Sequence, residues 1–303
     1  MATPKEALDF EARWATRVAI ATLLGVALLI ASVFAVSSLG GGGEAESLRS
    51  VHDHASTVTI SSILQAVGFA LLVAPLVFLF KAAAARSPKM RQQFLPLVIA
   101  APLALGVASV LNGAAANEAA QDFVDGKATT AMTQKEAVKE CREEKDKAAD
   151  CPATTLEDDK AKSAIDDASL RSVSEGFRLG GSLGLAFALL YGCLFAMRAG
   201  LLSRFWGSLG MALGVACVLG LYQFSLIWFV YFGLLAGSWL PKGRPPAWET
   251  GEAIPWPTPG EKAAAGIGTD PDVIDGEAEE EPADPAAGAN GSSDPPRKRK
   301  KRD

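Results

Sequence analysis

The sequence has little of the chemistry on which most active sites depend. Its 303 residues include two histidines and four cysteines, and the histidines stand together as His52 and His54. A nucleophile paired with a histidine base is therefore implausible. A phosphate-binding glycine loop followed by lysine is also missing. We therefore predict a protein that is not an enzyme and that uses no cofactor.

Charge is absent from long stretches of the chain. Five apolar runs contain no Asp, Glu, Lys, Arg or His: Val18–Ser38, Val58–Phe80, Phe94–Gly113, Leu179–Met197 and Trp206–Leu240. A helix of about 20 residues covers the roughly 30 Å hydrocarbon core of a bilayer. The last run, about 52 Å as one helix, is too long for one ordinary crossing, so we expect a hairpin that turns near Tyr222–Ser225. The sequence predicts an all-α polytopic membrane bundle of about six transmembrane helices.

Small residues mark where these helices should pack closely. Inside lipid, association depends on close van der Waals approach, which small side chains permit. The positions with this pattern are Gly180, Gly184, Ala188, Gly192 and Ala196 in one run, and the pairs Gly210–Gly214 and Gly233–Gly237 in the last. We expect the two pairs to bring the halves of the last hairpin together. The polar residues Gln65, Asn112, Tyr191, Tyr222 and Gln223 are expected to hydrogen-bond between helices.

The polar insert over residues 114–178 should extend the third and fourth spans as an external helical hairpin. Capping-box patterns at Thr133–Glu136 and Thr154–Glu157 predict helices near 134–148 and 156–176. Cys141 and Cys151 flank the turn between them. In an oxidising compartment they can form a disulfide that stabilises the tip. In a reducing compartment they stay free thiols. A metal site in the insert is unlikely, since no further Cys or His lies there.

The N-terminal part holds two local predictions. Residues 1–17 should form an interfacial helix, begun by a capping box at Thr3–Glu6. A signal peptide cleaved after Ala35–Ser37 is the alternative, but the apolar run is longer than is usual for one. Leu39–Thr57 is expected to be a short loop. A metal at His52 and His54 is the weaker interpretation, because no third or fourth ligand is evident.

Basic residues in the short connections set the orientation. Six spans place every basic segment on one side of the membrane, which is the cytoplasmic side. These segments are residues 1–17, the second and fourth connections and the segment after the last span. Five spans would break this agreement. The predicted organisation is residues 1–17 cytoplasmic, 18–113 as three spans, 114–178 outside, 179–240 as three spans and 241–303 as a cytoplasmic tail. This places the protein in the cell membrane with both termini inside.

The tail over residues 241–303 is rich in Pro, Gly, Ala and acids, so it should be disordered. It ends in the basic run Arg297, Lys298, Arg299, Lys300, Lys301 and Arg302. The simpler interpretation is that the tail acts as a stop-transfer and solubility segment. The more specific interpretation is that its basic run binds anionic lipid by electrostatic attraction. Nucleic acid is an unlikely partner. The Trp-bearing, Pro-rich piece Pro245–Pro259 should pack on the cytoplasmic face or act as a binding motif.

Three segments carry a family resemblance. They are Gly200–Gly210 (GLLSRFWGSLG), Ser62–Gly68 (SILQAVG) and Glu252–Trp256 (EAIPW). Together they are similar to an uncharacterised family of six-span bacterial membrane proteins, catalogued as a domain of unknown function. The resemblance covers about residues 1–260. It implies six spans and carries no activity to this chain.

Two functions fit these observations. The first is a non-enzymatic membrane protein that acts through its external hairpin and cytoplasmic tail, with the lipid bilayer and other envelope proteins as partners. The second is a channel, carrier or sensor for a lipid or other apolar molecule. It needs no intramembrane charge, but it does need a wide internal cavity.

Overall fold

Helices make up the described part of the chain. The computed structural model describes residues 3–37, 43–128, 139, 151–241 and 243–256, with the backbone alone over 151–155. Within these residues there is no strand, which confirms the all-α prediction. The helices in chain order are α1 (Pro4–Ser37), α2 (Glu44–Asp53), α3 (Ala55–Arg86), η1 (Gln92–Phe94), α4 (Leu95–Val124), α6 (Cys151–Asp167), α7 (Arg171–Arg198), α8 (Arg204–Val218), η2 (Tyr222–Phe224), α9 (Ser225–Ala236) and α10 (Ala247–Thr250).

Some predictions concern other parts of the chain. The helix expected near 134–148, the side chains of Cys141 and Cys151, and the tail with its basic run at 297–302 lie outside the described residues. Residues 1–256 cluster as one compact unit, and the features below belong to it.

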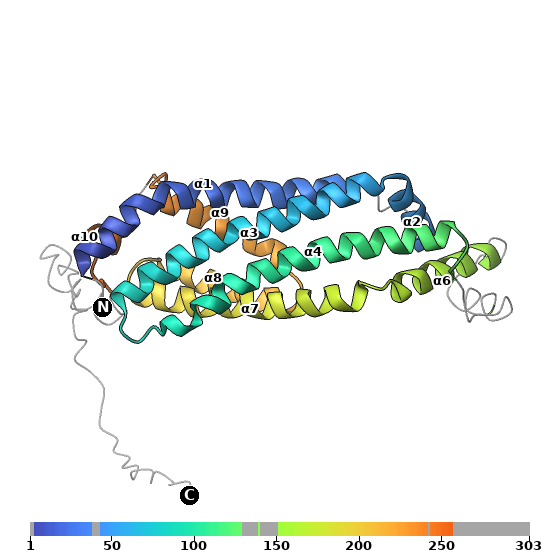
Figure 1. Ribbon diagram of the computed structural model, residues 1–303. Helices are drawn as coiled ribbons and strands as arrows, with labels where there is room; N and C mark the ends of the chain where they lie inside the picture. Colours follow the sequence, from blue (N-terminus) through green and yellow to red (C-terminus); the bar gives the residue numbers. More distant parts are fainter. Residues whose placement is uncertain (1–2, 38–42, 129–138, 140–150, 242, 257–303) are drawn as a thin grey trace, which may run out of the picture. The chain divides into compact units, whose positions relative to one another are not determined.

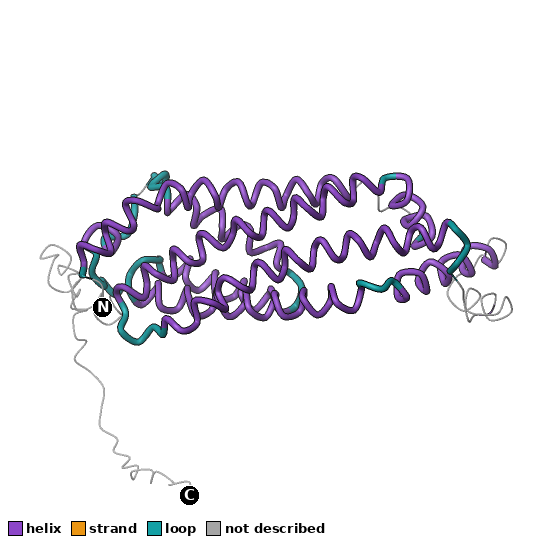
Figure 2. Tube along the Cα trace, in the orientation of Figure 1, coloured by secondary structure: helices purple, strands orange, loops and turns teal. Residues whose placement is uncertain are grey.

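Four long helices, α1, α3, α4 and α7, form the frame of this unit (Figures 1 and 2). Each has at least 28 residues and therefore extends over about 40 Å or more. All four are long and apolar enough to cross a membrane, judged by length and composition. They run antiparallel in chain order, with Gly25 of α1 beside Gly68 of α3 and Gly181 of α7 beside Leu105 of α4. This confirms a helical bundle compatible with membrane insertion.

The outer faces of these helices carry large apolar side chains. Ile20, Phe34, Ile60 and Leu179 are each more than half exposed. Exposed apolar surface on this scale normally marks contact with a membrane or another protein. Because lipid offers the backbone no hydrogen-bond partner, a helix is the form in which such runs can cross it.

The helices α8 and α9 form a short hairpin against the long ones. They have 15 and 12 residues and are separated at residues 219–224, where the sequence predicted the turn. Gly210 lies against Cys193 of α7 and Trp228 of α9, whereas Gly214 and Gly233 lie nearest to α7 and α1. Of the two glycine pairs, Gly210 thus lies against the other helix of the hairpin, whereas Gly214 and Gly233 pack on long helices. Each hairpin helix packs mainly on a long helix.

The other small residues that the sequence predicts for close packing also differ in their surroundings. A Cβ added at Gly184 would lie 2.7 Å from the Ala101 Cβ of α4, so only glycine permits this approach. Gly192 lies beside α3, and Ala188 and Ala196 are buried. Gly180 is different, because nothing lies within 4 Å of an added Cβ there. At Gly237, the three atoms nearest to an added Cβ belong to the ring of Trp239, two residues away.

Large side chains fill the centre of the bundle. Trp228, Phe229 and Phe232 of α9 and Phe78 of α3 are almost fully buried. Trp228 and Phe232 stack with ring centroids 5.3 Å apart. Rings of this size carry much of the packing energy of a core. The described centre is therefore a packed region.

The polar residues of the spans find two kinds of environment. The Tyr191 hydroxyl accepts a 2.9 Å hydrogen bond from the Arg91 backbone N–H, which joins α7 to the connection between α3 and α4. Gln65, Asn112 and Tyr222 instead line one surface cavity of about 260 Å³ between α3, α4, α7 and η2.

Candidate functional site

A separate group of helices lies at the end of the bundle opposite the N-terminus. This helical cap consists of α2, the last part of α4 and α6 (Figure 1). Its small core is made mostly of alanine, with Leu48 as the largest buried member. Over the described residues 43–57 the expected loop is therefore wrong, since α2 forms there by burying Ala45 and Leu48 against α4 and α6.

Carboxylates distant in sequence cap the ends of the helices here. Asp158 of α6 accepts a 3.0 Å hydrogen bond from the Ala45 N–H in the first turn of α2. A Cβ at Gly43 would lie 2.6 Å from that carboxylate, so the glycine permits the contact. Glu118 of α4 accepts from the N–H and hydroxyl of Ser169, at 3.2 and 2.9 Å. The bond to Ala45 satisfies an amide that the start of α2 leaves free, and the bonds to Ser169 hold the connection between α6 and α7 against α4.

The structure differs from the sequence expectations for the insert in two places. The helix predicted over 156–176 is interrupted at residues 168–170, where Ser169 bonds to Glu118. The helix before this interruption, α6, begins at Cys151. Thr154, which the predicted capping box placed at the start of a helix, therefore lies inside α6. Past residue 113, α4 continues unbroken to Val124, so the first part of the insert extends the preceding apolar helix.

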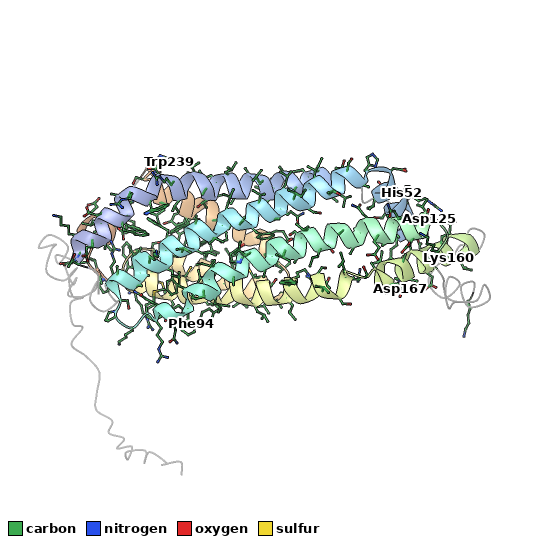
Figure 3. All side chains as sticks on the ribbon, in the orientation of Figure 1. His52, Phe94, Asp125, Lys160, Asp167 and Trp239 are labelled. Carbon is green, nitrogen blue, oxygen red and sulfur yellow. The ribbon has the colours of Figure 1, made fainter. Side chains whose placement is uncertain are left out.

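A charged pocket of about 410 Å³ opens on the cap. Its lining includes Arg49, His52 and Asp53 from α2, Phe123 and Val124 from α4, and Glu157 and Lys160 from α6. Figure 3 shows His52 and Lys160 together at this end of the molecule. The pocket therefore combines two cations, two carboxylates and one aromatic ring from three helices.

Arg49 organises this pocket. Its Nη2 lies 2.9 Å from Oε2 of Glu157, and its Cζ lies 5.6 Å from the ring of Phe123. Both partners of the ion pair are about half exposed, so it contributes at most about 1 kcal/mol to stability. Its chief effect is to fix the direction of the guanidinium. Lys160 appears in no ion pair among the described residues.

The turn after α4 adds a second fixed pair of charges. Lys127 Nζ lies 2.9 Å from Asp125 and 3.3 Å from Asp122. The hydrogen bond and the charge of Lys127 lower the pKa of Asp125, and the two aspartates raise the pKa of Lys127. The lowered pKa means that this interaction is present at neutral pH and is lost as the pH falls through the pKa of the folded carboxyl.

The two histidines are not brought together. His52 lines the pocket, whereas Nδ1 of His54 lies 3.0 Å from the Ser50 carbonyl oxygen. Within the described part of the chain, no group of three or more His, Cys, Asp or Glu residues is placed to hold a metal ion.

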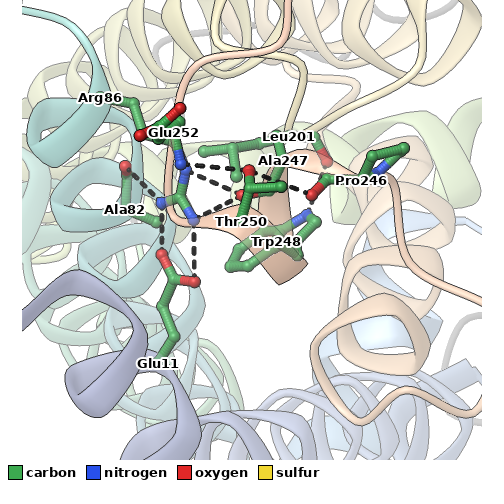
Figure 4. A network of polar contacts seen from close by, with 9 residues as sticks. All are labelled: Glu11, Ala82, Arg86, Leu201, Pro246, Ala247, Trp248, Thr250 and Glu252. Atoms are coloured by element: carbon green, nitrogen blue, oxygen red, sulfur yellow. Dashed lines mark hydrogen bonds and ion pairs between the residues drawn. The ribbon is translucent and has the colours of Figure 1, made fainter. Parts of the chain in front are cut away.

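A second polar cluster lies at the N-terminal end of the bundle. Glu11 of α1 and Arg86 of α3 form a buried ion pair (Figure 4). Arg86 Nη2 lies 3.0 Å from Glu11 Oε2, and Nη1 donates to the other carboxylate oxygen. Arg86 also donates to the Ala247 carbonyl, at 2.8 and 3.1 Å, and to the Ala82 carbonyl, at 3.1 Å. The N–H donors of Arg86 are thus all engaged within the protein. The cluster therefore serves as an anchor between segments of the fold and offers no free donor to a ligand.

This anchor holds the segment 244–256, which we name the C-terminal strap. Trp248 donates from Nε1 to the Leu201 carbonyl at 2.9 Å, and Trp256 to the Leu202 carbonyl at 2.7 Å. The Ile254 N–H donates to the Ala199 carbonyl at 3.1 Å. For residues 245–256 the structure therefore decides between the two expectations: they pack on the end of the bundle.

Sequence reasoning missed the buried pair, because it treated residues 1–17 as a separate interfacial helix. The structure has one continuous helix from Pro4 to Ser37, although the predicted capping box is present, with the Thr3 N–H 2.7 Å from Glu6 Oε2. A signal was available. Glu11 stands four residues from Ala7 and from Ala15, in phase with the buried stripe of the helix.

No family model, curated protein or solved structure compared with this chain matches it. We therefore infer function from the residues of this chain alone. The resemblance to a six-span family stays a prediction.

Proposed function

We propose that the chain is a six-span membrane protein with both termini in the cytoplasm and the cap outside. Basic residues support this orientation. Lys81, Lys89 and Arg91 lie between the apolar parts of α3 and α4, and Arg198 follows that of α7, whereas Arg49 is the single basic residue between α1 and α3. Short connections rich in Lys and Arg stay in the cytoplasm, and longer inserts cross largely regardless of charge.

The count of six requires that α8 and α9 both cross. At about 22 and 18 Å they are shorter than a typical hydrocarbon core. The turn between them supports a full crossing nonetheless. Tyr222 lines a cavity together with Glu175 and Arg178, which immediately precede the apolar run of α7. The hairpin thus extends to the level at which charged residues resume.

The proposed role is binding and not catalysis. The cap would recognise a polar segment of another envelope protein through the pocket that Arg49, Asp53 and Lys160 line. The construction of the cap supports this proposal. The cap has its own alanine core, and a carboxylate distant in sequence caps one of its helices. These features hold a pocket of mixed charge beyond the apolar part of the bundle. Complementary charges mainly confer specificity and association rate on such an interface. We also propose that the tail contacts partners or anionic lipid through residues 297–302.

The packed centre weighs against the alternative role as a channel, carrier or sensor. Such a protein needs a wide internal cavity. The described centre is filled instead by Trp228, Phe229 and Phe232, each at 0% exposure.

Site-specific photo-crosslinking in cells tests the binding role. A photoreactive residue at Asp53, which is exposed at the pocket, should give a discrete adduct with one polypeptide. The Lys160→Glu variant should reduce this adduct about tenfold, which corresponds to about 1.4 kcal/mol of binding. Lys162→Glu is the matched control, because it makes the same charge change on the exposed side of α6 outside the pocket lining.

Equal loss of the adduct in Lys160→Glu and Lys162→Glu would show that overall cap charge, and not the pocket, directs binding. No adduct in the parent protein would reject the interaction itself. A phosphatase fused after Asp303 tests the orientation separately, since activity outside the cytoplasm would contradict it.

A further inference from the structure

Two neighbouring surface cavities lie at the N-terminal end of the bundle, beside α1 and α3. The first, of about 410 Å³, is an apolar groove lined by Phe10, Trp14 and Val18 of α1 and by residues of α3 from Ala70 to Lys81. The second, of about 370 Å³, has polar members such as Ser87 and Gln92. Phe10 and Lys81 line both cavities. The apolar groove is thus bordered, at Phe10 and Lys81, by a more polar cavity.

The apolar part faces outward at the edge of the apolar runs. Its floor is made of small and branched residues of α3, among them Ala70, Val73 and Ala74, and the ring of Trp14 on its wall is 42% exposed. The groove therefore lies where lipid chains meet the protein, not in the packed centre. A tryptophan at such a boundary is typical of the headgroup level of a membrane.

Lys81 supplies the charge at the polar end. Its Nζ lies 5.4 Å from the ring of Phe10, and its side chain is exposed. In the described part of the chain no carboxylate lies within ion-pair distance of it. Arg17 provides a second cation, with its Cζ 5.4 Å from the Trp14 ring. Lys81 directly follows the run Val58–Phe80, and Arg17 directly precedes Val18, so both cations stand at one membrane boundary.

None of the acids in the neighbourhood forms an ion pair with Lys81 among the described residues. Glu11 is paired with Arg86. Glu6 lines the polar cavity and keeps its negative charge, since the Thr3 N–H that donates to its carboxylate at 2.7 Å is neutral. Asp9 is exposed and lines neither cavity.

We propose that this groove binds one anionic phospholipid. Its phosphate contacts Lys81, one acyl chain lies along the α1–α3 groove, and its headgroup extends toward Ser87 and Gln92. Two observations together favour a lipid as the occupant. Lys81 has no ion-pair partner among the described residues, and the apolar groove runs from Lys81 along the apolar parts of α1 and α3. The site is independent of the cap and rests only on insertion of α1 and α3 in a bilayer.

The experiment is mass spectrometry of the intact, full-length protein, purified in detergent and supplied with equal amounts of phosphatidylglycerol and phosphatidylcholine. The parent protein should retain one phosphatidylglycerol in preference to phosphatidylcholine. Lys81→Gln should reduce that retention about fivefold, which corresponds to about 1 kcal/mol. Lys89→Gln, an exposed lysine that lines neither cavity, should change it less than twofold.

A second pair of variants tests the apolar half. Ala70→Phe places a ring in the groove and should lower retention of phosphatidylglycerol. Both Ala70 and Ala100 are exposed on apolar helices, so Ala100→Phe on α4 is the matched control and should have no effect. Because these side chains are exposed, the fold should tolerate both changes.

Three outcomes would overturn the proposal. Equal retention of the two lipids by the parent protein, or equal loss in the Lys81 and Lys89 variants, would mean diffuse surface attraction. Displacement by inorganic phosphate, with no effect of Ala70→Phe, would mean a free-anion site. A second copy of the chain bound in place of lipid, and weakened by Ala70→Phe, would mean that the groove is a dimer contact.

Discussion

Replacing Glu11 by glutamine removes the carboxylate that neutralises Arg86 and leaves the guanidinium charge buried. The pair has side-chain exposures of 3% and 0%. Removing one partner of a buried ion pair destabilises a protein by about 3–5 kcal/mol, because the remaining charge is uncompensated. This pair lies at an end of the bundle, so we expect the lower figure. In a unit of this size about 3 kcal/mol lowers Tm by about 6–12 °C.

The assay is thermal unfolding of the purified protein in detergent, followed by tryptophan fluorescence. Asp9→Asn is the control, since it neutralises an exposed carboxylate two residues away on the same helix. The double variant Glu11→Gln with Arg86→Met should be more stable than Glu11→Gln alone, because no charge then stays buried. It should not regain the parent Tm, since the Ala247 carbonyl loses its donors and an unsatisfied buried group costs about 1–3 kcal/mol. A Tm shift below 2 °C for Glu11→Gln, or strict additivity of the single changes, would refute this reasoning.

Two further predictions concern close packing and the insert. Gly184→Leu forces a side chain against α4 and should destabilise the protein by about 1–3 kcal/mol in the same thermal assay, whereas Gly180→Leu, with open space around it, should be nearly neutral. The sequence also predicts that Cys141 and Cys151 form a disulfide. A membrane-impermeant maleimide should therefore label them only after reduction, and labelling without reduction would contradict the bond.

The apolar frame was predictable because its signal is local. A run of 20 uncharged residues specifies a helix of bilayer length without knowledge of its neighbours. The interruption at residues 219–224 was also predictable, since the length of Trp206–Leu240 exceeds one crossing. The capping box at Thr3 and Glu6 involves residues three apart, and its hydrogen bonds are present.

The cap and the anchor depend on partners far away in the sequence. The α2 helix is short, polar and preceded by glycines, so its own residues indicate a loop. It forms where Asp158, 113 residues away, caps Ala45. Glu11 and Arg86 are 75 residues apart. The helical period of α1 indicates that Glu11 is buried, but one sequence without its fold does not specify which charges meet.

The contrast between Arg86 and Lys81 shows what the fold adds to the sequence. In the sequence both are basic residues after one apolar run, and both serve equally to orient the chain. In the structure Arg86 is buried, and its guanidinium is engaged by Glu11 and by two backbone carbonyls. Lys81, five residues earlier and exposed, has the ring of Phe10 5.4 Å from its ammonium nitrogen and no ion pair among the described residues. A charge with its partners inside the protein stabilises the fold, whereas an exposed charge at the end of an apolar groove is placed to meet a ligand. For this reason we expect substitution of Arg86 to lower stability, whereas Lys81 is the residue that we propose for lipid binding.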